Sequence, residues 1–557
     1  MLNNIKEQLQ SYLHETLKNC LPTSDALPEI ELEKPAEKQH GDFACNIALK
    51  SAKILKRPPI EIAKEFVRSI ESNLPASVLK DKIEKVEVKN PGFINFFLTT
   101  GSVCDVLHEV LDQKNNYGAS VFGQKEKIQI EFVSANPTGP LSVAHARQAA
   151  VGDALGNILK FLGFDVTKEY YVNDGGNQIN ILGQSIRLRG LELLGEKIEF
   201  PENAYQGDYI KDMAKEFMAE RSIRTPKDWD KISAQEVSQY GATYLLAVIK
   251  NELDDFNVHF DVWSYESKIA TKEMIEKMLN LLTERGFIYE KDGARWFKST
   301  QFGDDKDRVV QKSDGSYTYL TPDIVYHKNK FERGFSRVFN IWGPDHHGYI
   351  PRIKAAAQAL GKKKDSIEVL IVQLATIFRG GEALSMSTRR GQYISLREVM
   401  DEVGVDAARY FFMMRHIKNH LEFDLELAKK QSSENPVYYI QYGHARMHSI
   451  NKKAKDAGIS MKAGSLTLLS NEEEMDLIKK IGRYQEALMQ CYQQLDPYPL
   501  VNYLHELAMC FHKFYDVHRV IDENKDLSAE RLVLVNAAGI VLANGLKLLG
   551  LNAPQSM

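Results

Sequence analysis

The chain has 557 residues, of which 43% are hydrophobic and 26% are charged, and its formal net charge is -4. This length is several times that of a usual domain, so we expect about three globular domains and no long disordered tract. We find no signal sequence and no uninterrupted apolar run of about 18 residues, which predicts a cytoplasmic protein without a membrane span.

A small α/β domain is predicted for residues 1–112. Helical segments come first, and the run 92–98 that follows them is rich in aromatic and β-branched residues, as is typical of a strand. The polar stretch 112–118 is interpreted as a linker to the next domain.

Between residues 120 and 433, short apolar runs alternate with helical stretches. The runs 128–133, 338–342 and 369–373 have the length of buried strands. This alternation predicts a parallel sheet covered by helices, the architecture of Rossmann-type nucleotide-binding domains. A charged segment at about 200–295 interrupts the alternation and is interpreted as an insertion.

Residues 127–147 read as a strand, a proline-bounded turn and the start of a helix. Apolar or small residues recur every four positions from Ala150 to Leu162, as expected for a helix that packs on a sheet. The start of such a helix favours phosphate, and His145 could donate a further hydrogen bond there. From these residues alone, an ordinary turn with a surface histidine is an equally good interpretation.

The segment 317–326 contains Tyr319 and, four residues later, Asp323. A carboxylate can accept a guanidinium group through two parallel hydrogen bonds, which a lysine side chain cannot offer. An aspartate after a proline is more commonly part of a turn or a helix cap. The residues alone therefore favour a structural role for Asp323.

The segment 343–348 carries two adjacent histidines after an apolar run. No nearby residues have the spacing of metal ligands, so we interpret the segment as a polar wall of a binding site, with His346 as the favoured contact. The five cysteines lie far apart and form no Cys-x-x-Cys pair, so they are expected to be reduced core residues. No metal site is predicted.

The basic segment 385–391 is the candidate for a second phosphate-binding element. Charge that develops on a leaving pyrophosphate must be neutralised, and Arg389 and Arg390 could do this. Without further information the segment is only a basic turn.

The last part of the chain, 434–557, is predicted to be a helical bundle because strand patterns are absent and helical patterns cover 475–494, 500–520 and 529–549. Aromatic residues near 438–442 and 511–515 lie beside cations and could stack on RNA bases, although most aromatic residues at helical spacing belong to a core.

RNA binding must depend on local basic clusters, because the chain has a slightly negative net charge. The lysines at 362–364, 429–430, 452–453 and 479–480 are candidates. Each cluster by itself is more commonly a solvated surface.

Taken together, these segments resemble the arginyl-tRNA synthetases of class I. Ser134 to Pro140 followed by His145 is similar to the family's loop and its His-Ile-Gly-His element, and 385–391 is similar to its Lys-Met-Ser-Lys-Ser loop. The segments 40–49 and 90–95 resemble the family's additional N-terminal domain. The resemblance thus extends from about residue 40 to the end of the chain.

The sequence departs from the family pattern in both elements. Ser142 stands where the first histidine is expected, and Ala144 stands where the glycine is expected. Both lysines of the second loop are absent, and Gly139 offers no lysine in the first loop. Arg389 and Arg390 are the expected substitutes.

The resemblance implies a role for each matching residue. The residues expected to promote the reaction are His145, Ser142, Arg389 and Arg390. Those expected to bind ATP are Pro137, Thr138, Gly139, Pro140, Ser142, Ala144, His145, Ser385, Met386, Ser387, Thr388 and Arg389. Those expected to bind arginine are Ser134, Ala135, Asn136, His145, Tyr319, Asp323 and His346.

The implied reaction is activation of L-arginine with ATP, followed by transfer to the 3′-terminal adenosine of tRNA(Arg), through its 2′ hydroxyl. Mg²⁺ is expected on the ATP phosphates and not in a dedicated protein site. The resemblance also implies that activation requires bound tRNA, that the N-terminal domain grips the tRNA and that the bundle binds the anticodon. A monomer is expected.

Two alternatives remain open from the sequence. A class I synthetase for another amino acid is disfavoured by Tyr319 and Asp323. A tRNA-binding, synthetase-like protein with weakened or lost activation is compatible with the altered ATP elements.

Overall fold

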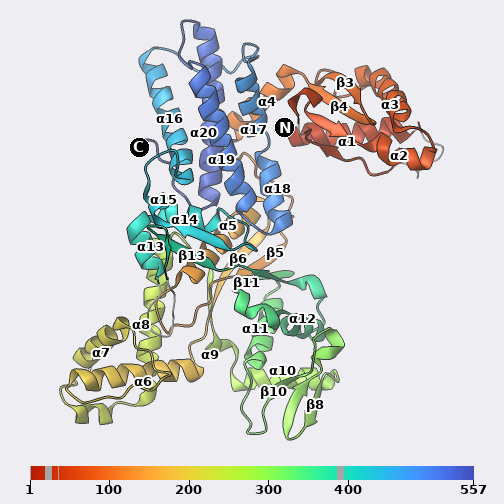
Figure 1. Ribbon diagram of the computed structural model, residues 1–557. Helices are drawn as coiled ribbons and strands as arrows, with labels where there is room; N and C mark the ends of the chain where they lie inside the picture. The colour runs from red at the N-terminus through yellow and green to blue at the C-terminus, as the bar shows by residue number, and fades with distance from the viewer. Residues whose placement is uncertain (1, 19, 21–27, 36, 385–393) are drawn as a thin grey trace.

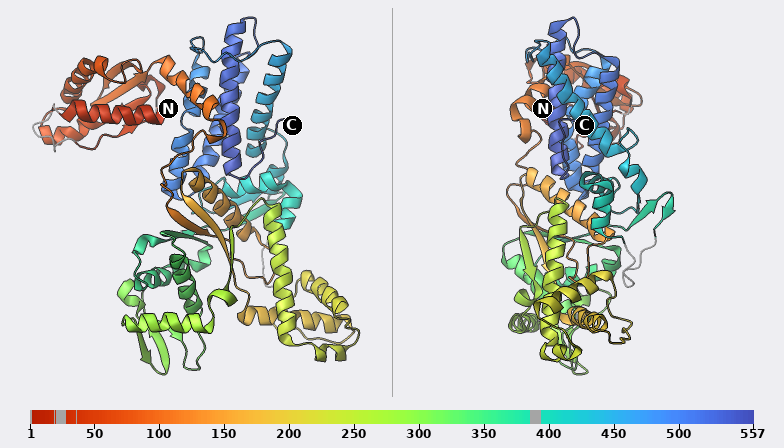
Figure 2. Two further views of the ribbon diagram at one scale, coloured as in Figure 1. Left: turned by 180° about the vertical axis from the view of Figure 1, so that it is seen from behind. Right: turned by 90° about the vertical axis from the view of Figure 1, so that its left-hand side faces the viewer.

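The structure is a computed structural model that describes residues 2–18, 20, 28–35, 37–384 and 394–557. A helical bundle stands on a central sheet, a small domain projects from the side of the bundle, and two lobes extend from the opposite side of the sheet (Figure 1). The same arrangement is seen from behind in Figure 2.

The small N-terminal domain packs helices against an antiparallel sheet with the order β1-β2-β4-β3. Its elements are α1 (Leu2–Lys18), β1 (Leu32–Glu33), β2 (Phe43–Cys45), α2 (Ile47–Leu55), α3 (Pro59–Asn73), β3 (Ile83–Lys89) and β4 (Phe93–Leu98). α4 (Thr100–Gln113) then leads away from this domain and packs on the bundle. A 2.6 Å ion pair between Asp42 and Lys479 also joins the domain to the bundle.

The central sheet has the order β12-β11-β5-β6-β7, and all its neighbouring strands are parallel. Its elements are β5 (Lys127–Glu131), α5 (Val143–Phe161), β6 (Asp165–Val172), β7 (Val262–Tyr265), β11 (Arg337–Trp342) and β12 (Ile367–Ile371). The strand order reverses at β5, since β6 and β7 lie on one side of it and β11 and β12 on the other. In such sheets ligands bind at the carboxyl ends of the strands beside this reversal.

The helix α5 lies close to the sheet because Gly152 faces Phe132, the residue after β5, without a side chain. A Cβ atom at this position would lie 2.3 Å from the Cγ atom of Phe132, which is far too close for any other residue. The contact holds the middle of α5 close to the carboxyl end of β5.

Two lobes are inserted after β6 and after β7. The first is helical and has its own core around Phe217 and Trp229. It contains α6 (Gly176–Leu193), α7 (Asp208–Glu220) and α8 (Ala234–Asp255). The second contains α9 (Glu266–Ile269), α10 (Lys272–Glu284), β8 (Ile288–Lys291), β9 (Ala294–Phe297), β10 (Arg308–Gln311) and α11 (Leu320–Glu332). The helix α12 (Ile350–Ala359), which connects β11 to β12, packs against α11 of this lobe.

A smaller sheet connects the parallel core to the bundle. β13 pairs with β15 in parallel and with β14 in antiparallel orientation. The elements are β13 (Ala375–Arg379), β14 (Glu382–Ala383), α13 (Leu396–Val403), α14 (Val405–Met413), β15 (Leu421–Asp424) and α15 (Leu425–Lys429).

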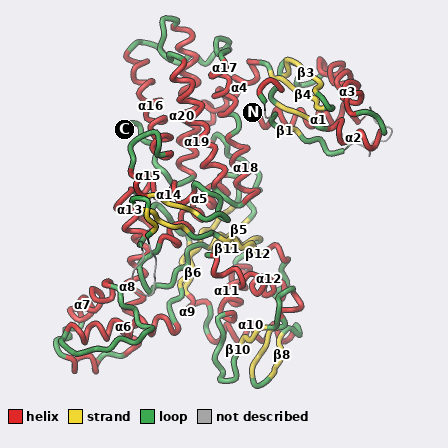
Figure 3. Tube along the Cα trace, viewed as in Figure 1, coloured by secondary structure: helices red, strands yellow, loops and turns green. Residues whose placement is uncertain are grey.

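The C-terminal bundle consists of long helices (Figure 3). They are α16 (Pro436–Asp456), α17 (Glu472–Ile481), α18 (Tyr484–Gln494), α19 (Tyr498–Val517) and α20 (Lys525–Leu548). Within the described part of the chain, α20 alone has the length and hydropathy of a membrane span, but 78% of its most apolar stretch is buried among the other helices. The predicted fold class is confirmed: a parallel Rossmann-type core, a small N-terminal α/β domain and an all-α C-terminal bundle.

Candidate active site

A cleft of about 580 Å³ lies at the carboxyl ends of β5, β11 and β12. Sequence analysis had singled out eight of its lining residues: Ser134, Ala135, Asn136, Ser142, Ala144, His145, Asp323 and His346. These residues come from distant parts of the chain, so the fold brings most of the predicted site together.

The turn after β5 forms one wall of the cleft and has an unusual backbone. Val133 and Ser134 both adopt left-handed conformations, with φ values of 65° and 39°. Such conformations are strained for residues other than glycine and concentrate at functional sites. The Ser134 hydroxyl donates to Glu131 Oε1 at 3.0 Å and accepts from the Tyr171 amide at 3.1 Å, which holds the turn in place.

Two further hydrogen bonds fasten this turn to the rest of the domain. The Tyr170 hydroxyl donates to the Ala135 carbonyl at 2.7 Å. The Asn136 Nδ2 atom donates to Gln178 Oε1 at 2.7 Å, and this bond connects the turn to α6.

His145 lies in the first turn of α5, and its protonation follows from its contacts. The Ser142 amide donates to His145 Nδ1 at 3.2 Å, so Nδ1 is an acceptor and the ring proton is on Nε2. Burial lowers the pKa of His145 to about 4 because it disfavours the charged ring. At neutral pH the residue is therefore a neutral hydrogen-bond donor at the helix start.

Asp323, in the first turn of α11, is a carboxylate without a cationic partner. The Tyr349 hydroxyl donates to its Oδ2 atom at 2.6 Å, and no described residue forms an ion pair with it. Burial, together with the nearby negative charges of Glu131 and Glu266, raises the pKa of Asp323 to about 7. A cationic ligand would relieve both effects.

A buried network beneath Asp323 engages the neighbouring cation, Lys330, with other partners. Lys330 pairs with Glu131 at 2.5 Å and donates to Asn340 Oδ1 at 3.0 Å. His327 Nδ1 contacts the Asp323 carbonyl oxygen at 2.8 Å, and its Nε2 contacts the Asn340 amide nitrogen at 2.9 Å. Burial lowers the pKa of His327 to about 3, so the ring is neutral and donates through Nδ1.

Several predicted site residues do not line the cleft. Tyr319 is 77% exposed and lies one helical turn before Asp323. The lining also excludes Pro137, Thr138, Gly139 and Pro140. The Thr138 carbonyl instead accepts a 2.8 Å hydrogen bond from Tyr209, in the helical lobe. His346 does line the cleft, but its side chain is exposed and lies 3.3 Å from Asp345.

The second predicted ATP element lies outside the described residues. This concerns Ser385, Met386, Ser387, Thr388, Arg389 and Arg390. The described chain resumes at Ile394, whose carbonyl accepts from the Val143 amide at 3.4 Å, and Ser395 forms a β-bridge with Ser142. The residues that directly follow the segment therefore lie alongside the start of α5.

Further lining residues were not assigned to the site from sequence. They are Glu131, Gln148, Tyr171, Asn173, Tyr326, His327, Trp342, Tyr349 and Gln373. Glu131 could have been predicted from sequence, because a carboxylate within a buried strand is unusual. Nothing in the sequence around Tyr349 indicates a role in the site. The Asn173 Oδ1 atom is buried without a partner in the described structure, so it is free to accept from a ligand.

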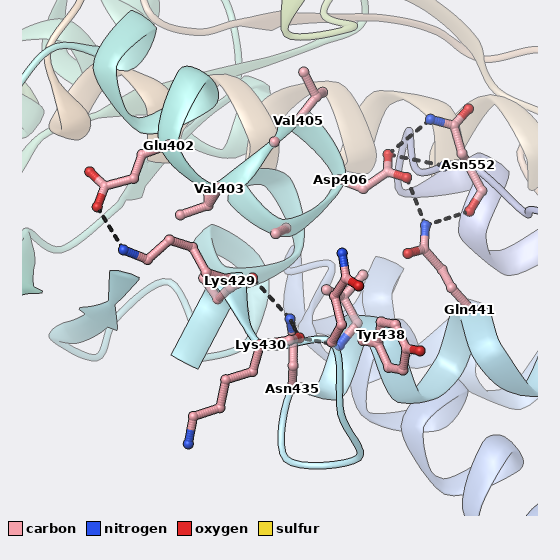
Figure 4. A pocket seen from close by; sticks show the side chains of 15 residues that line it. Glu402, Val403, Val405, Asp406, Lys429, Lys430, Asn435, Tyr438, Gln441 and Asn552 are labelled. Atoms are coloured by element: carbon pink, nitrogen blue, oxygen red, sulfur yellow. Dashed lines mark hydrogen bonds and ion pairs between the residues drawn. The ribbon is translucent and has the colours of Figure 1, made fainter. Parts of the chain in front are cut away.

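A second polar hollow, of about 570 Å³, lies between the core and the bundle (Figure 4). Lys429 pairs there with Glu402 and Glu426, and Lys430 pairs with Glu434. These acidic partners compensate the lysines, so the hollow does not form a cationic site.

The C-terminal tail is bound beside this second hollow. The Gln441 Nε2 atom donates to Asp406 at 2.7 Å and to the Asn552 carbonyl at 3.0 Å, and these bonds connect α14, α16 and the tail (Figure 4). In the described part of the chain, no three His, Cys, Asp or Glu residues are grouped as metal ligands.

Three family models match the chain in sequence order. They are the arginyl tRNA synthetase N terminal domain over residues 3–98, the catalytic domain of class I (R) tRNA synthetases over 106–435, and the DALR anticodon binding domain over 440–557. Together they cover nearly the whole chain.

The chain also matches relatives over their whole length. The chain is 45% identical to arginine–tRNA ligase 1 of Halalkalibacterium halodurans and 43% identical to arginine–tRNA ligase of Bacillus subtilis, each over 100% of both chains. Among solved structures, arginyl-tRNA synthetases from Thermus thermophilus and Plasmodium falciparum superpose with TM-scores of 0.75 and 0.74. They are 21% and 17% identical and cover 99% of both chains, so they support the fold.

Proposed function

This chain belongs to the arginyl-tRNA synthetase family, and from that premise we propose how its cleft binds arginine and ATP. The protein is a ligase that charges tRNA with arginine. The assignment of individual residues rests on the geometry of the cleft and on the chemistry of the two substrates.

The observation that carries the proposal is the unpaired carboxylate of Asp323. A guanidinium group that enters the cleft can donate two parallel hydrogen bonds to it and can supply the missing positive charge. The 2.6 Å bond from Tyr349 fixes the carboxylate for this contact. Lysine would offer only a point charge, which explains how the site would select arginine.

The other end of arginine is proposed to lie against the turn after β5. Ser134, Ala135 and Asn136 present polar backbone and side-chain groups there, and His145, in the first turn of α5, lines the same cleft. His346 is proposed to close the side of the cleft. A contact from Tyr319 requires its exposed side chain to turn toward Asp323.

ATP is proposed to bind at the start of α5. Ser142, Ala144 and His145 line this end of the cleft, where the helix dipole favours phosphate. The neutral His145 ring donates from Nε2 to a phosphate oxygen. Pro137, Thr138, Gly139 and Pro140 are also proposed to bind ATP, as are Ser385, Met386, Ser387, Thr388 and Arg389.

The reaction needs no covalent enzyme intermediate. In the first step, a carboxylate oxygen of arginine forms a bond to the α-phosphorus of ATP, and the bond from that phosphorus to pyrophosphate breaks. In the second step, the 2′ hydroxyl of the terminal tRNA adenosine attacks the arginyl carbonyl, and AMP leaves. Both steps depend on positioning and on charge neutralisation, for which we propose His145, Ser142, Arg389 and Arg390.

We also propose how the metal ion, the tRNA and the outer domains take part. Mg²⁺ is proposed to enter with the ATP phosphates. Residues 1–112 and 434–557 are proposed to hold the tRNA, and the catalytic domain is proposed to span 120–433. We further propose a cytoplasmic monomer.

Arginine-dependent exchange of pyrophosphate into ATP tests the function directly. We expect exchange with arginine, and not with lysine, when tRNA(Arg) is present. A protein that binds tRNA but shows no exchange would support the alternative of lost activation. Exchange with a different amino acid would contradict the specificity that we assign to Asp323.

A further inference from the structure

Arg147 is a buried cation that the reaction described above does not use. It lies on α5, two residues after His145, and its side chain is fully buried. No described residue forms an ion pair with it. A buried charge without a direct counter-charge is costly and must be stabilised by hydrogen bonds.

Backbone carbonyl oxygens from separate segments surround the Arg147 guanidinium. The Nη1 atom donates to the carbonyl oxygens of Gln373 at 2.7 Å, Asn419 at 2.9 Å and Leu374 at 3.4 Å. The Nη2 atom donates to the carbonyl oxygen of His416 at 3.1 Å, and Nε donates to that of Phe412 at 3.4 Å. Only a planar group with several fixed donors can reach carbonyls in so many directions.

Two of these carbonyls belong to the wall of the cleft. Gln373 and Leu374 line it, and the chain continues from them into β13 and β14, which precede the second ATP element. The Gln373 amide also donates to the Ile417 carbonyl at 2.8 Å, so the segment 416–419 supports the wall from behind. Arg147 therefore connects the start of α5 both to Gln373 and Leu374 in the wall and to the segment 416–419 behind it.

The bundle holds the same supporting segment from its other side. Asp496, in the turn between α18 and α19, accepts from the Ile417 amide at 2.9 Å, and its carboxylate lies 3.1 Å from His416 Nδ1. Asp496 is buried. Its negative charge favours the Arg147 cation, whose pKa burial lowers only to about 10, so Arg147 stays charged at neutral pH.

We propose that Arg147 is a positioning residue for ATP: its guanidinium fixes the Gln373–Leu374 wall relative to His145, on the nucleotide side of the cleft. The inference rests on the proposed function and deepens it. Arginine binding should depend much less on Arg147, because Asp323 and Tyr349 belong to α11 and the segment after β11, which Arg147 does not contact.

The test compares Arg147→Lys and Arg147→Met with the full-length protein in pyrophosphate exchange with tRNA present. Lysine keeps the charge but cannot reach all the carbonyls. We expect Arg147→Lys to raise the KM for ATP at least tenfold and to lower kcat, while the KM for arginine stays within about twofold. An equal change in both KM values, or no change in either, would overturn the proposal.

Arg409→Lys is the matched control. Arg409 is also fully buried and donates to the carbonyls of Leu549, Phe256 and Asn257, and it forms a 2.6 Å ion pair with Asp153; none of these residues lines the cleft. We expect this variant to lower Tm without changing the KM for ATP. If Arg409→Lys raised the KM for ATP as much as Arg147→Lys, loss of any buried arginine would be enough to weaken ATP binding. This result would overturn a specific role for Arg147.

Asp496→Asn provides a second route if the Arg147 variants do not fold. It weakens the support of segment 416–419 and leaves Arg147 in place, so we expect a severalfold rise in the KM for ATP alone. A normal KM for ATP in this variant would contradict the role of the segment. Pyrophosphate exchange by the unmodified protein tests the proposed function separately. If the unmodified protein shows no exchange, the proposed function is wrong, whereas a failure confined to the predicted KM changes contradicts only the role of Arg147.

Discussion

The Tyr349 hydroxyl donates a 2.6 Å hydrogen bond to the Asp323 carboxylate across a separation of 26 residues. Tyr349 ends the short segment that follows β11, and Asp323 lies in the first turn of α11. The bond stabilises the ionised form of a carboxyl group that burial otherwise keeps partly protonated. Binding of arginine should therefore depend on the charge of Asp323 and on this hydrogen bond.

Replacement of Asp323 by asparagine should remove the charge and retain the shape. Loss of one partner of a buried, hydrogen-bonded charge pair costs about 2 to 5 kcal/mol of binding, so the KM for arginine should rise at least about 30-fold. Pyrophosphate exchange at varied arginine measures this change, and a filter-binding assay should show unchanged affinity for tRNA. Asp314→Asn, in an exposed turn of the same lobe, is the control. A normal KM in Asp323→Asn would remove the pocket assignment.

Arginine binding should weaken as the pH falls from 8 to 6. The pKa of Asp323 is about 7, so the carboxyl is mostly ionised at pH 8 and mostly protonated at pH 6. For a single group of this pKa, the Kd for arginine should be about tenfold higher at pH 6 than at pH 8. Calorimetric titration with arginine measures it. A Kd that stays constant over this range would contradict the assignment of the charged form as the ligand.

Tyr349→Phe should move this pH dependence. The hydroxyl lowers the pKa of Asp323, so its removal should raise that pKa and shift the midpoint for arginine binding to higher pH. The same titrations, repeated between pH 6 and 9, provide the comparison. If Tyr349→Phe weakens binding equally at every pH, the hydroxyl contacts arginine and does not act through Asp323.

His145→Asn should lower the rate of activation without a new dependence on pH. The ring is a neutral donor because its pKa is about 4, and loss of one donor to a charge that develops in the transition state costs about 100- to 1,000-fold in kcat. Exchange at saturating substrates measures kcat, and His259→Asn, on an exposed histidine, is the control. A kcat that follows the titration of a group near pH 6.5 in the unmodified protein, but not in His145→Asn, would show that the charged ring acts instead.

Arg389→Ala and Arg390→Ala test the second ATP element, which lies outside the described residues. If these arginines replace the missing lysines, each substitution should lower kcat for exchange by about tenfold or more, because pyrophosphate charge is no longer neutralised. Arg397→Ala changes an arginine of α13 that pairs with Asp255 and should have no such effect. If all three variants were as active as the unmodified protein, neither Arg389 nor Arg390 would neutralise the pyrophosphate, and another cation would have to do so.

The parallel core and its edge could be predicted because they depend on local patterns. Apolar runs identify the strands, and the turn from Ser134 to Pro140 followed by a helix marks the phosphate-binding end. Asn136 and His145 belong to the same connection from a strand to a helix, so both were expected at the carboxyl edge of the sheet. The cleft contains both, together with Asp323.

The contacts that give these residues their properties could not be predicted in this way. Glu131 and Lys330 are 199 residues apart, and nothing near either residue indicates the other. Arg147 looks like an ordinary helical arginine in sequence, yet the carbonyls around it are up to 272 residues away.

The sequence by itself therefore determined the order of the domains, the strands of the core and the residue types available for the chemistry, because periodicity and turn composition act over a few residues. Only the tertiary structure decided which of those residues share a cleft and how they are charged. Burial and long-range hydrogen bonds set the pKa values of Asp323 and His145, and these depend on packing between segments that are remote in the chain.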